Sequence, residues 1–282
     1  MGQESRKYSK AEVDGHLLIV TINRPEVYNA LHPMANQELS DIFDEFAANP
    51  ELWVAIITGA GDKAFSAGND LKYHAELRAK TGGRPHSPPK GFGGLTNRHD
   101  LDKPVIAAVN GVAAGAGANL ALACDVRLAS DAAKLGETFV RIGLHPDWAG
   151  TWHLPRLAGV AKSLDLCWTG DLIEAGEAQR LGLFQRVWPA ASFEREWRDY
   201  AARLAAGPQV AIRAAKASLR AAPGRGLEEC LAAERAAQER CWQSPDAAEG
   251  VRAFVEKRAP VFASSAPPES DLAPSRAART FE

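Results

Sequence analysis

Residues 64–71, AFSAGNDL, and residues 110–122, NGVAAGAGANLAL, are the two stretches that decide the fold. Each follows a short apolar run, residues 53–58 and residues 105–109, whose length and closing glycine are typical of a buried strand. The small side chains let a ligand approach the backbone closely and leave N–H groups as donors. The second stretch also opens a helix, where free amides and the positive end of the helix dipole coincide. The pattern predicts two strand–turn units whose amides bind one oxyanion.

These glycines also have other interpretations. Taken singly, each turn is equally consistent with a tight bend that serves only helix packing. A dinucleotide site is disfavoured, because Gly115 and Gly117 do not fit the GxGxxG spacing and no acidic residue stands in the expected context of the following strand.

The flanking sequence repeats the order strand, turn, helix. Residues 16–21 are apolar and β-branched and are followed by Pro25, which predicts a strand that ends in a turn. Apolar residues recur at helical spacing from Pro33 to Asn49, and residues 125–129 return to a strand pattern. From Ser192 onward, alanine-rich helical patterns predict a helical C-terminal module.

The predicted organisation has four parts: a flexible N-terminus over residues 1–10, an α/β core over 11–190, a helical module over 191–263 and a disordered tail over 264–282. The tail is predicted from its Ser, Pro, Ala and charged composition. Within the core, residues 73–102 are too long for an idle connection, and we predict a mobile functional loop beside the active site.

Composition excludes several classes of function. The 33 Lys and Arg nearly balance the 35 Asp and Glu, which argues against nucleic acid or an anionic membrane as a partner. The four cysteines form no CxxC pair, so neither a metal nor a disulfide framework is expected. The first ten residues contain no apolar signal-peptide segment, and no later stretch reaches membrane-spanning length, so we expect a cytoplasmic protein.

Together these motifs resemble the crotonase (enoyl-CoA hydratase/isomerase) superfamily over residues 13–262. The resemblance rests on Asn23-Arg24-Pro25 with Asn29-Ala30-Leu31, the Ala67-Gly68-Asn69-Asp70 turn, Lys103-Pro104-Val105 leading to Asn110-Gly111, and residues 253–258, AFVEKR. It implies an α/β spiral of ββα units with a helical C-terminal module for trimerisation, an acyl-CoA substrate and a homotrimer or hexamer. It implies no metal or separate cofactor.

The resemblance also implies site residues. The oxyanion donors would be the backbone N–H groups of Asn69 and Ala116. Coenzyme A would pass Ser66, Ala67, Asp70, Leu71 and Lys72, while Phe254 and Lys257 would contact the CoA of a neighbouring subunit. From their residue types alone, Phe254 would be a core residue and Lys257 a solvated helix charge.

Hydratases of this superfamily carry two glutamates that activate water, and here the matching positions hold Asn119 and Phe139. Neither side chain is a useful proton carrier, so two-acid water addition loses its machinery, although both positions are expected to line the substrate site. Glu137 stands two residues before Phe139, on the same face of an extended segment but displaced by about 7 Å. Whether Glu137 takes part is left open.

A different carboxylate, Asp147, stands in residues 142–156, IGLHPDWAGTWHLPR. Its aromatic neighbours would desolvate it and raise its pKa toward the useful range of a base, although Pro-Asp is also ordinary turn chemistry. This segment and residues 110–122 resemble the ring-epoxide isomerases that act on 2-(1,2-epoxy-1,2-dihydrophenyl)acetyl-CoA, and the related Δ3,Δ2-enoyl-CoA isomerases. That resemblance implies that Asp147 is the catalytic acid/base.

The sequence therefore predicts an acyl-CoA isomerase that stabilises a thioester enolate and moves a proton with Asp147. One alternative is an enoyl-CoA hydratase in which Glu137 or Asp147 positions water. Another is a non-catalytic acyl-CoA-binding subunit. His99, His145 and His153 are candidate substrate contacts, although surface or internally hydrogen-bonded histidines are the more ordinary interpretation.

Overall fold

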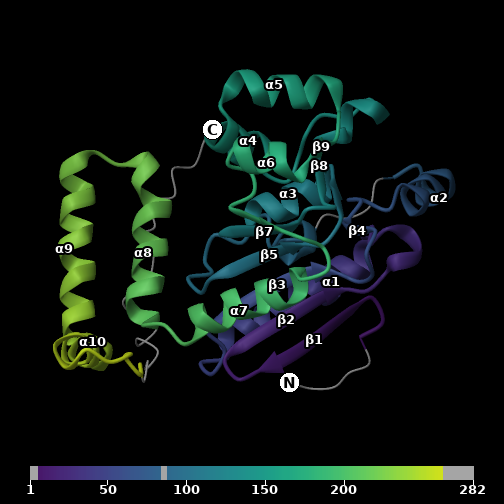
Figure 1. The fold of residues 1–282 in the computed structure, drawn as a ribbon. Helices are drawn as coiled ribbons and strands as arrows, with labels where there is room; N and C mark the ends of the chain where they lie inside the picture. Colours follow the sequence, from purple (N-terminus) through teal and green to yellow (C-terminus); the bar gives the residue numbers. More distant parts are fainter. Residues whose placement is uncertain (1–5, 84–87, 263–282) are drawn as a thin grey trace. The chain divides into compact units, whose positions relative to one another are not determined.

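The computed structural model describes residues 6–83 and 88–262, so the predicted disordered tail lies outside the described residues, as do residues 1–5 of the predicted flexible N-terminus. The described chain divides into two compact units (Figure 1). The first contains residues 6–98 and 105–204, and the second contains residues 99–104 and 205–262. The site residues in the core stretches all belong to the first unit.

A six-stranded sheet is the centre of the first unit, in the order β1-β2-β3-β5-β7-β10. Its strands are β1 (Ser9–Asp14), β2 (Leu17–Ile22), β3 (Val54–Gly59), β5 (Val105–Val109), β7 (Val126–Ser130) and β10 (Arg186–Trp188). From β2 to β10 all neighbours are parallel, and only β1 is antiparallel to β2. The central strands β3 and β5 are mostly apolar because both faces of such a sheet are buried.

A four-stranded sheet, β4-β6-β8-β9, lies in the same unit. Its strands are β4 (Ala64–Ser66), β6 (Val112–Ala114), β8 (Lys134–Gly136) and β9 (Ile173–Glu174). Along the chain, β3, β5 and β7 of the large sheet are each followed by β4, β6 and β8 of the small one. This alternation is the predicted spiral of ββα units.

Helices follow these strand pairs and carry the site. They are α1 (Pro33–Ala48), α2 (Leu71–Thr81), α3 (Ala116–Ala123), α4 (Gly150–Ala158), α5 (Val160–Thr169), α6 (Ala175–Arg180) and α7 (Phe193–Ala205), with 3-10 turns η1 (Pro25–Val27), η2 (Phe92–Gly94) and η3 (Thr138–Ile142). Helix α1 begins where Pro33 follows His32, whose ring Nδ1 accepts the Ala35 amide at 3.1 Å. Its predicted apolar face is fully buried, which places Phe43 and Phe46 in the core.

The predicted mobile loop over residues 73–102 is wrong for two parts of its length. Residues 73–81 belong to helix α2, and residues 92–94 form the buried turn η2. A Cβ on Gly94 would lie 2.5 Å from the Cα of Ser40, and the Gly93 amide donates to Asn36 Oδ1 at 2.7 Å. This part of the segment is therefore packed against α1, while residues 84–87 lie outside the described residues.

The N-terminal prediction also needs correction, because strand β1 begins at Ser9, inside the segment predicted to be flexible. All six residues of β1 pair with β2, from Ser9 opposite Ile22 to Asp14 opposite Leu17. Four of these residues are polar or charged, which is typical of an edge strand. Because β1 has no apolar run, the sequence pattern did not predict it.

The second unit is helical, as predicted for the C-terminal module. It contains α8 (Gln209–Ala221), the turn η4 (Ala222–Gly224), α9 (Leu227–Gln243) and α10 (Pro245–Glu256). Helices α8 and α9 run side by side in opposite directions (Figure 1). Arg213 of α8 forms an ion pair with Asp102, and Lys216 donates to the backbone oxygen of Lys103, so residues 99–104 are tied to this unit.

Candidate active site

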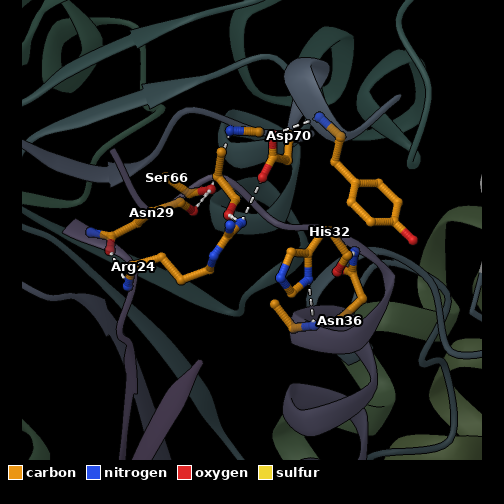
Figure 2. Close-up of polar contacts among 10 residues, drawn as sticks. Arg24, Asn29, His32, Asn36, Ser66 and Asp70 are labelled. Carbon is orange, nitrogen blue, oxygen red and sulfur yellow. Dashed lines mark hydrogen bonds and ion pairs between the residues drawn. The ribbon is translucent and has the colours of Figure 1, made fainter. Parts of the chain in front are cut away.

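Hydrogen bonds between Asn29 and residues 64–66 fix the start of the Ala67–Asp70 turn (Figure 2). The Ser66 hydroxyl donates to the Asn29 backbone oxygen at 2.9 Å and accepts the Gly68 amide at 3.2 Å. The Asn29 side chain donates to Ala64 O at 2.8 Å. Ser66 and Asn29 are both fully buried, so their polar atoms are used to fix the turn rather than exposed to a ligand.

Arg24 and Asp70 form a buried ion pair at the end of this turn, with 3.0 Å between Arg24 Nη1 and Asp70 Oδ2 (Figure 2). Asp70 Oδ1 accepts the Tyr73 amide at 3.1 Å and thereby caps helix α2. Burial alone would raise the pKa of Asp70, but the hydrogen bonds from the Tyr73 amide and Arg24 hold it below its ordinary value. Asp70 is an anion committed to the fold.

Burial, followed by the neighbouring Arg24 charge, lowers the pKa of His32 at the start of α1. The His32 ring lies edge-on to Tyr8, with 4.4 Å between ring centroids. His32 is therefore a neutral capping group beside the Arg24–Asp70 pair, consistent with its acceptor role at Ala35.

The two glycine-rich turns lie in contact. Gly68 has φ +89°, and a Cβ there would meet Ala114 O at 2.8 Å and Ala116 N at 3.1 Å. A Cβ on Gly117 would meet Ser66 O at 2.1 Å. Neither turn tolerates a side chain between them, which explains why these positions are glycine.

The amides of Asn69 and Ala116 are free donors in these turns. Leu31 and Asn69 form a parallel bridge through Leu31 N to Gly68 O and Asp70 N to Leu31 O, so the Asn69 N–H points to the opposite side. Ala116 is the first residue of α3, where the N–H has no intrahelical acceptor. Within residues 6–83 and 88–262 neither amide has a protein acceptor.

Asn119 lies one turn further along α3 and forms a buried polar pair with Glu137, which follows β8. Both side chains are fully buried. Asn119 Nδ2 donates to the Asp147 backbone oxygen at 2.8 Å and lies 3.4 Å from Glu137 Oε2. In the described part of the chain, Asn119 Oδ1 and Glu137 Oε1 have no hydrogen-bond partner. The Asn119 amide thus joins two acidic residues, Glu137 and Asp147.

Asp147 stands on a strained turn that leads into α4. The next two residues, Trp148 and Ala149, have φ values of 51° and 64°, an uncommon conformation for residues other than glycine. The residue is exposed at the surface, yet desolvation around its carboxyl raises the pKa of Asp147 to about 6, against the lowering effects of a backbone hydrogen bond and of His145. Asp147 is ionised at neutral pH but has a pKa suited to a base.

Aromatic side chains surround these groups. Phe139 is buried, and its ring carbons lie 3.7 and 3.8 Å from the Cβ position of Gly115, so it packs over the start of α3. Phe92 and Trp148 have ring centroids 6.0 Å apart. The buried Trp148 Nε1 has no acceptor among the described residues. These rings provide the low-dielectric surroundings in which a carboxyl pKa rises.

Comparison with known proteins shows which family this chain belongs to. The family model for enoyl-CoA hydratase/isomerase matches residues 12–265. The chain belongs to the enoyl-CoA hydratase/isomerase family. A Rhodobacter capsulatus protein named "Probable enoyl-CoA hydratase" is 42% identical over 253 residues, which are 89% of this chain and 96% of the relative. The carnitinyl-CoA dehydratase of Citrobacter koseri is 40% identical, over 88% of this chain and 95% of its own.

Solved structures agree with the fold of this family. The enoyl-CoA hydratase of Bacillus anthracis superposes with a TM-score of 0.81 at 33% identity, covering 91% of this chain and 99% of its own. The enoyl-CoA hydratase of Mycobacterium tuberculosis H37Rv gives a TM-score of 0.82 at 32% identity, covering 90% and 97%. The predicted crotonase fold is confirmed.

The other residues predicted to contact CoA are exposed, and they lie in both units of the chain. Ala67, Leu71 and Lys72 are exposed at the turn and the start of α2. Phe254 and Lys257 lie in the second unit, on α10 and at its end, and Phe254 is 86% exposed. The prediction from residue type that Phe254 is a core residue is therefore wrong for the chain by itself.

The three candidate histidines differ in exposure. His99 and His145 are exposed, and His153 is half-buried on α4. Within the described ranges, no set of three His, Cys, Asp or Glu side chains is placed to hold a metal ion. None of the helices in those ranges is both long and apolar enough to cross a membrane.

Sequence reasoning did not find two features of this site. The Arg24–Asp70 ion pair joins residues 46 positions apart, and only the motifs themselves signalled that both ends are special. The contact between Asn119 and Glu137 was missed because an extended segment was assumed, which displaced Glu137 along the chain. The change of direction between β8 and η3 turns Glu137 inward instead.

Proposed function

We propose that this protein is an acyl-CoA isomerase in which Asp147 moves a proton along the acyl group of a CoA thioester. The observation that carries the proposal is the Asp147 carboxyl, whose pKa is raised to about 6. The backbone oxygen of the same residue accepts the Asn119 amide of helix α3, which begins at Ala116. The two positions that hold acids in hydratases carry Asn119 and Phe139 instead. One acid is sufficient for a proton shift, since the same group can take and return the proton.

The proposed reaction begins with the thioester oxygen bound by the backbone amides of Asn69 and Ala116. Ionised Asp147 removes a proton from the carbon next to the thioester, and the electron pair moves onto the oxygen to form an enolate. Protonated Asp147 then returns the proton further along the chain, and the double bond moves toward the thioester. Oxyanion donors of this kind contribute about 10²–10³ per donor, and acid–base catalysis about 10²–10⁴.

A hydratase is the second candidate, and two observations favour it. Relatives bear hydratase names, including the crotonyl-CoA hydratase of Syntrophomonas wolfei, 35% identical over 258 residues. Glu137 is an acid beside Asn119, so this site is not devoid of carboxyl groups as the aligned positions suggest. Water addition would then use Glu137 or Asp147 to hold and activate the water.

The discriminating experiment uses 3-enoyl-CoA and 2-enoyl-CoA esters in deuterated water with the wild-type protein and Asp147→Asn. Migration of the double bond without gain of water, lost in Asp147→Asn with CoA-ester affinity retained, supports the isomerase. Gain of water in product mass supports the hydratase. Asp62→Asn, on an exposed turn before β4, is the matched control and is expected to behave as wild type.

No bond migration, hydration or deuterium exchange with any ester, despite tight binding, would instead indicate an acyl-CoA-binding subunit.

The proposal includes a homotrimer or hexamer in the cytoplasm, in which Phe254 and Lys257 contact the CoA of a neighbouring subunit. Exposure of the Phe254 ring supports a surface that is covered on assembly. Light scattering of wild type and Phe254→Ser tests it: dissociation is expected for the variant.

A further inference from the structure

Glu137 is a buried acid for which the proposed reaction has no use. It follows β8, while the groups around it come from three other elements: Asn119 from α3, Asp147 from the turn before α4, and Cys167 from α5. Its side chain has no solvent exposure. A buried carboxyl that only filled space would be replaced at no cost by an apolar residue, so its polar contacts suggest a role.

The Asn119 amide has little freedom, because a Cβ on Gly150 would lie 2.4 Å from Asn119 Oδ1 and 2.5 Å from Nδ2. The side chain is thus packed against the first residue of α4. Its orientation follows from the Asp147 backbone oxygen, which accepts only from Nδ2. The second hydrogen of Nδ2 is then directed at Glu137 Oε2, so the carboxyl holds the amide from the side opposite to Asp147.

The charge of Glu137 is compatible with this arrangement. Burial raises the pKa of Glu137 to about 8, with the Asn119 hydrogen bond opposing the rise and the Asp147 charge adding to it. Glu137 is therefore mainly neutral at pH 7, and it can stand near the Asp147 anion without like-charge repulsion. Burial, and then the Glu137 charge, raises the pKa of Cys167 to about 11, so this neighbour is a neutral thiol.

We propose that Glu137 is a positioning residue that acts through Asn119: it fixes the amide that holds the Asp147 main chain, and so sets the place of the Asp147 carboxylate. The inference rests on the proposed role of Asp147 as the base. It also gives the strained Trp148–Ala149 turn a fixed attachment, because Asp147 O accepts from a buried, oriented donor.

The test measures exchange of the α protons of butyryl-CoA for deuterium, which reports enolate formation without bond migration or hydration. Glu137→Met keeps the length of the side chain and removes the acceptor, while Glu137→Gln keeps an acceptor for Asn119 Nδ2 and removes the titration. Misplacing a reacting group by about 1 Å costs about 10²-fold in rate. Glu137→Met is expected to lose about that factor in kcat with KM unchanged, and Glu137→Gln to stay close to wild type.

A double-mutant cycle with Asn119→Leu provides the readout that a merely structural role would not move. If Glu137 acts through Asn119, adding Glu137→Met to Asn119→Leu has no further effect on kcat. Should Glu137→Met fail to fold, Glu137→Leu, which also removes the acceptor, gives the same comparison alone and combined with Asn119→Leu. Equal, additive losses in the two backgrounds would overturn the inference.

Two other results would also overturn it. Exchange by Glu137→Gln as slow as by Glu137→Met would make the proton of Glu137 itself the reactive group, and full activity of Glu137→Met would leave it no role. Asp147→Asn separates these results from failure of the proposed function. Exchange that persists in Asp147→Asn removes the base on which both depend, whereas exchange lost in Asp147→Asn and retained in Glu137→Met removes only the role of Glu137.

Discussion

Substitution of Gly68 by alanine tests the contact between the two amide-bearing turns. Gly68 has φ +89°, and the added methyl would lie 2.8 Å from Ala114 O and 3.1 Å from Ala116 N. Left-handed backbone costs an L residue about 1–2 kcal/mol, and overpacking adds about 1–3 kcal/mol. We expect the free energy of unfolding to fall by about 2–5 kcal/mol in Gly68→Ala.

The same methyl would push the Ala116 amide away from the Asn69 amide, so catalysis should suffer as well as the fold. Displacement of one oxyanion donor costs about 10²–10³ in kcat. Gly15→Ala is the matched control, because Gly15 also has positive φ, +56°, but no atom lies within 4 Å of its Cβ position. It should lose only about 1–2 kcal/mol of stability and no activity.

Urea unfolding and deuterium exchange into butyryl-CoA measure the two effects on the same samples. If Gly68→Ala resembled Gly15→Ala in stability and kept the wild-type exchange rate, the close approach of Gly68 to Ala116 would not matter for the site. That result would refute the assignment of these two amides as a pair of oxyanion donors.

Three further predictions follow from the ionisable groups. The exchange rate should fall as pH drops below about 6, because the Asp147 base becomes protonated, and a pH–rate profile in saturating ester checks this. The raised pKa of Glu137 means that the unfolded chain loses this proton first as pH rises, so stability falls from pH 4.5 toward pH 8. Glu137→Gln should therefore gain on the order of a few kcal/mol over wild type at pH 8 and little at pH 4.5, as measured by urea unfolding at both values. Arg24→Met leaves buried Asp70 unpaired and should cost about 3–5 kcal/mol, while Arg24→Met/Asp70→Asn, compared by the same unfolding assay, should recover much of that loss.

The sequence predicted the elements that carry a strong pattern. Apolar runs without interruption located β2, β3 and β5, and helical spacing located α1 between Pro33 and Asn49. It failed where the pattern is weak. Strand β1 is polar because it is an edge strand, and α2, LKYHAELRAKT, has no buried residue and hence no apolar face to detect.

The candidate site divides in a similar way. Asp147 and the two turns were found from residue types and motif resemblance, because backbone donors and a carboxylate are local in sequence. The pairing of Asn119 with Glu137 depends on how α3 packs beside the segment after β8, and that is tertiary information. The predicted displacement of Glu137 came from a local assumption that the chain stays extended, which the turn η3 ends at Thr138.

The oxyanion donors proposed here are main-chain amides, and this has a consequence for how such a protein changes over generations. A side-chain donor is lost by one nucleotide change, whereas the amides of Asn69 and Ala116 persist through almost any replacement that keeps the turn. The proposed activation of the thioester therefore does not depend on which side chains stand at positions 69 and 116, as long as the two turns keep their shape. Under the proposed function, the position of the acidic side chain, and not the oxyanion donors, would then decide what happens to the enolate.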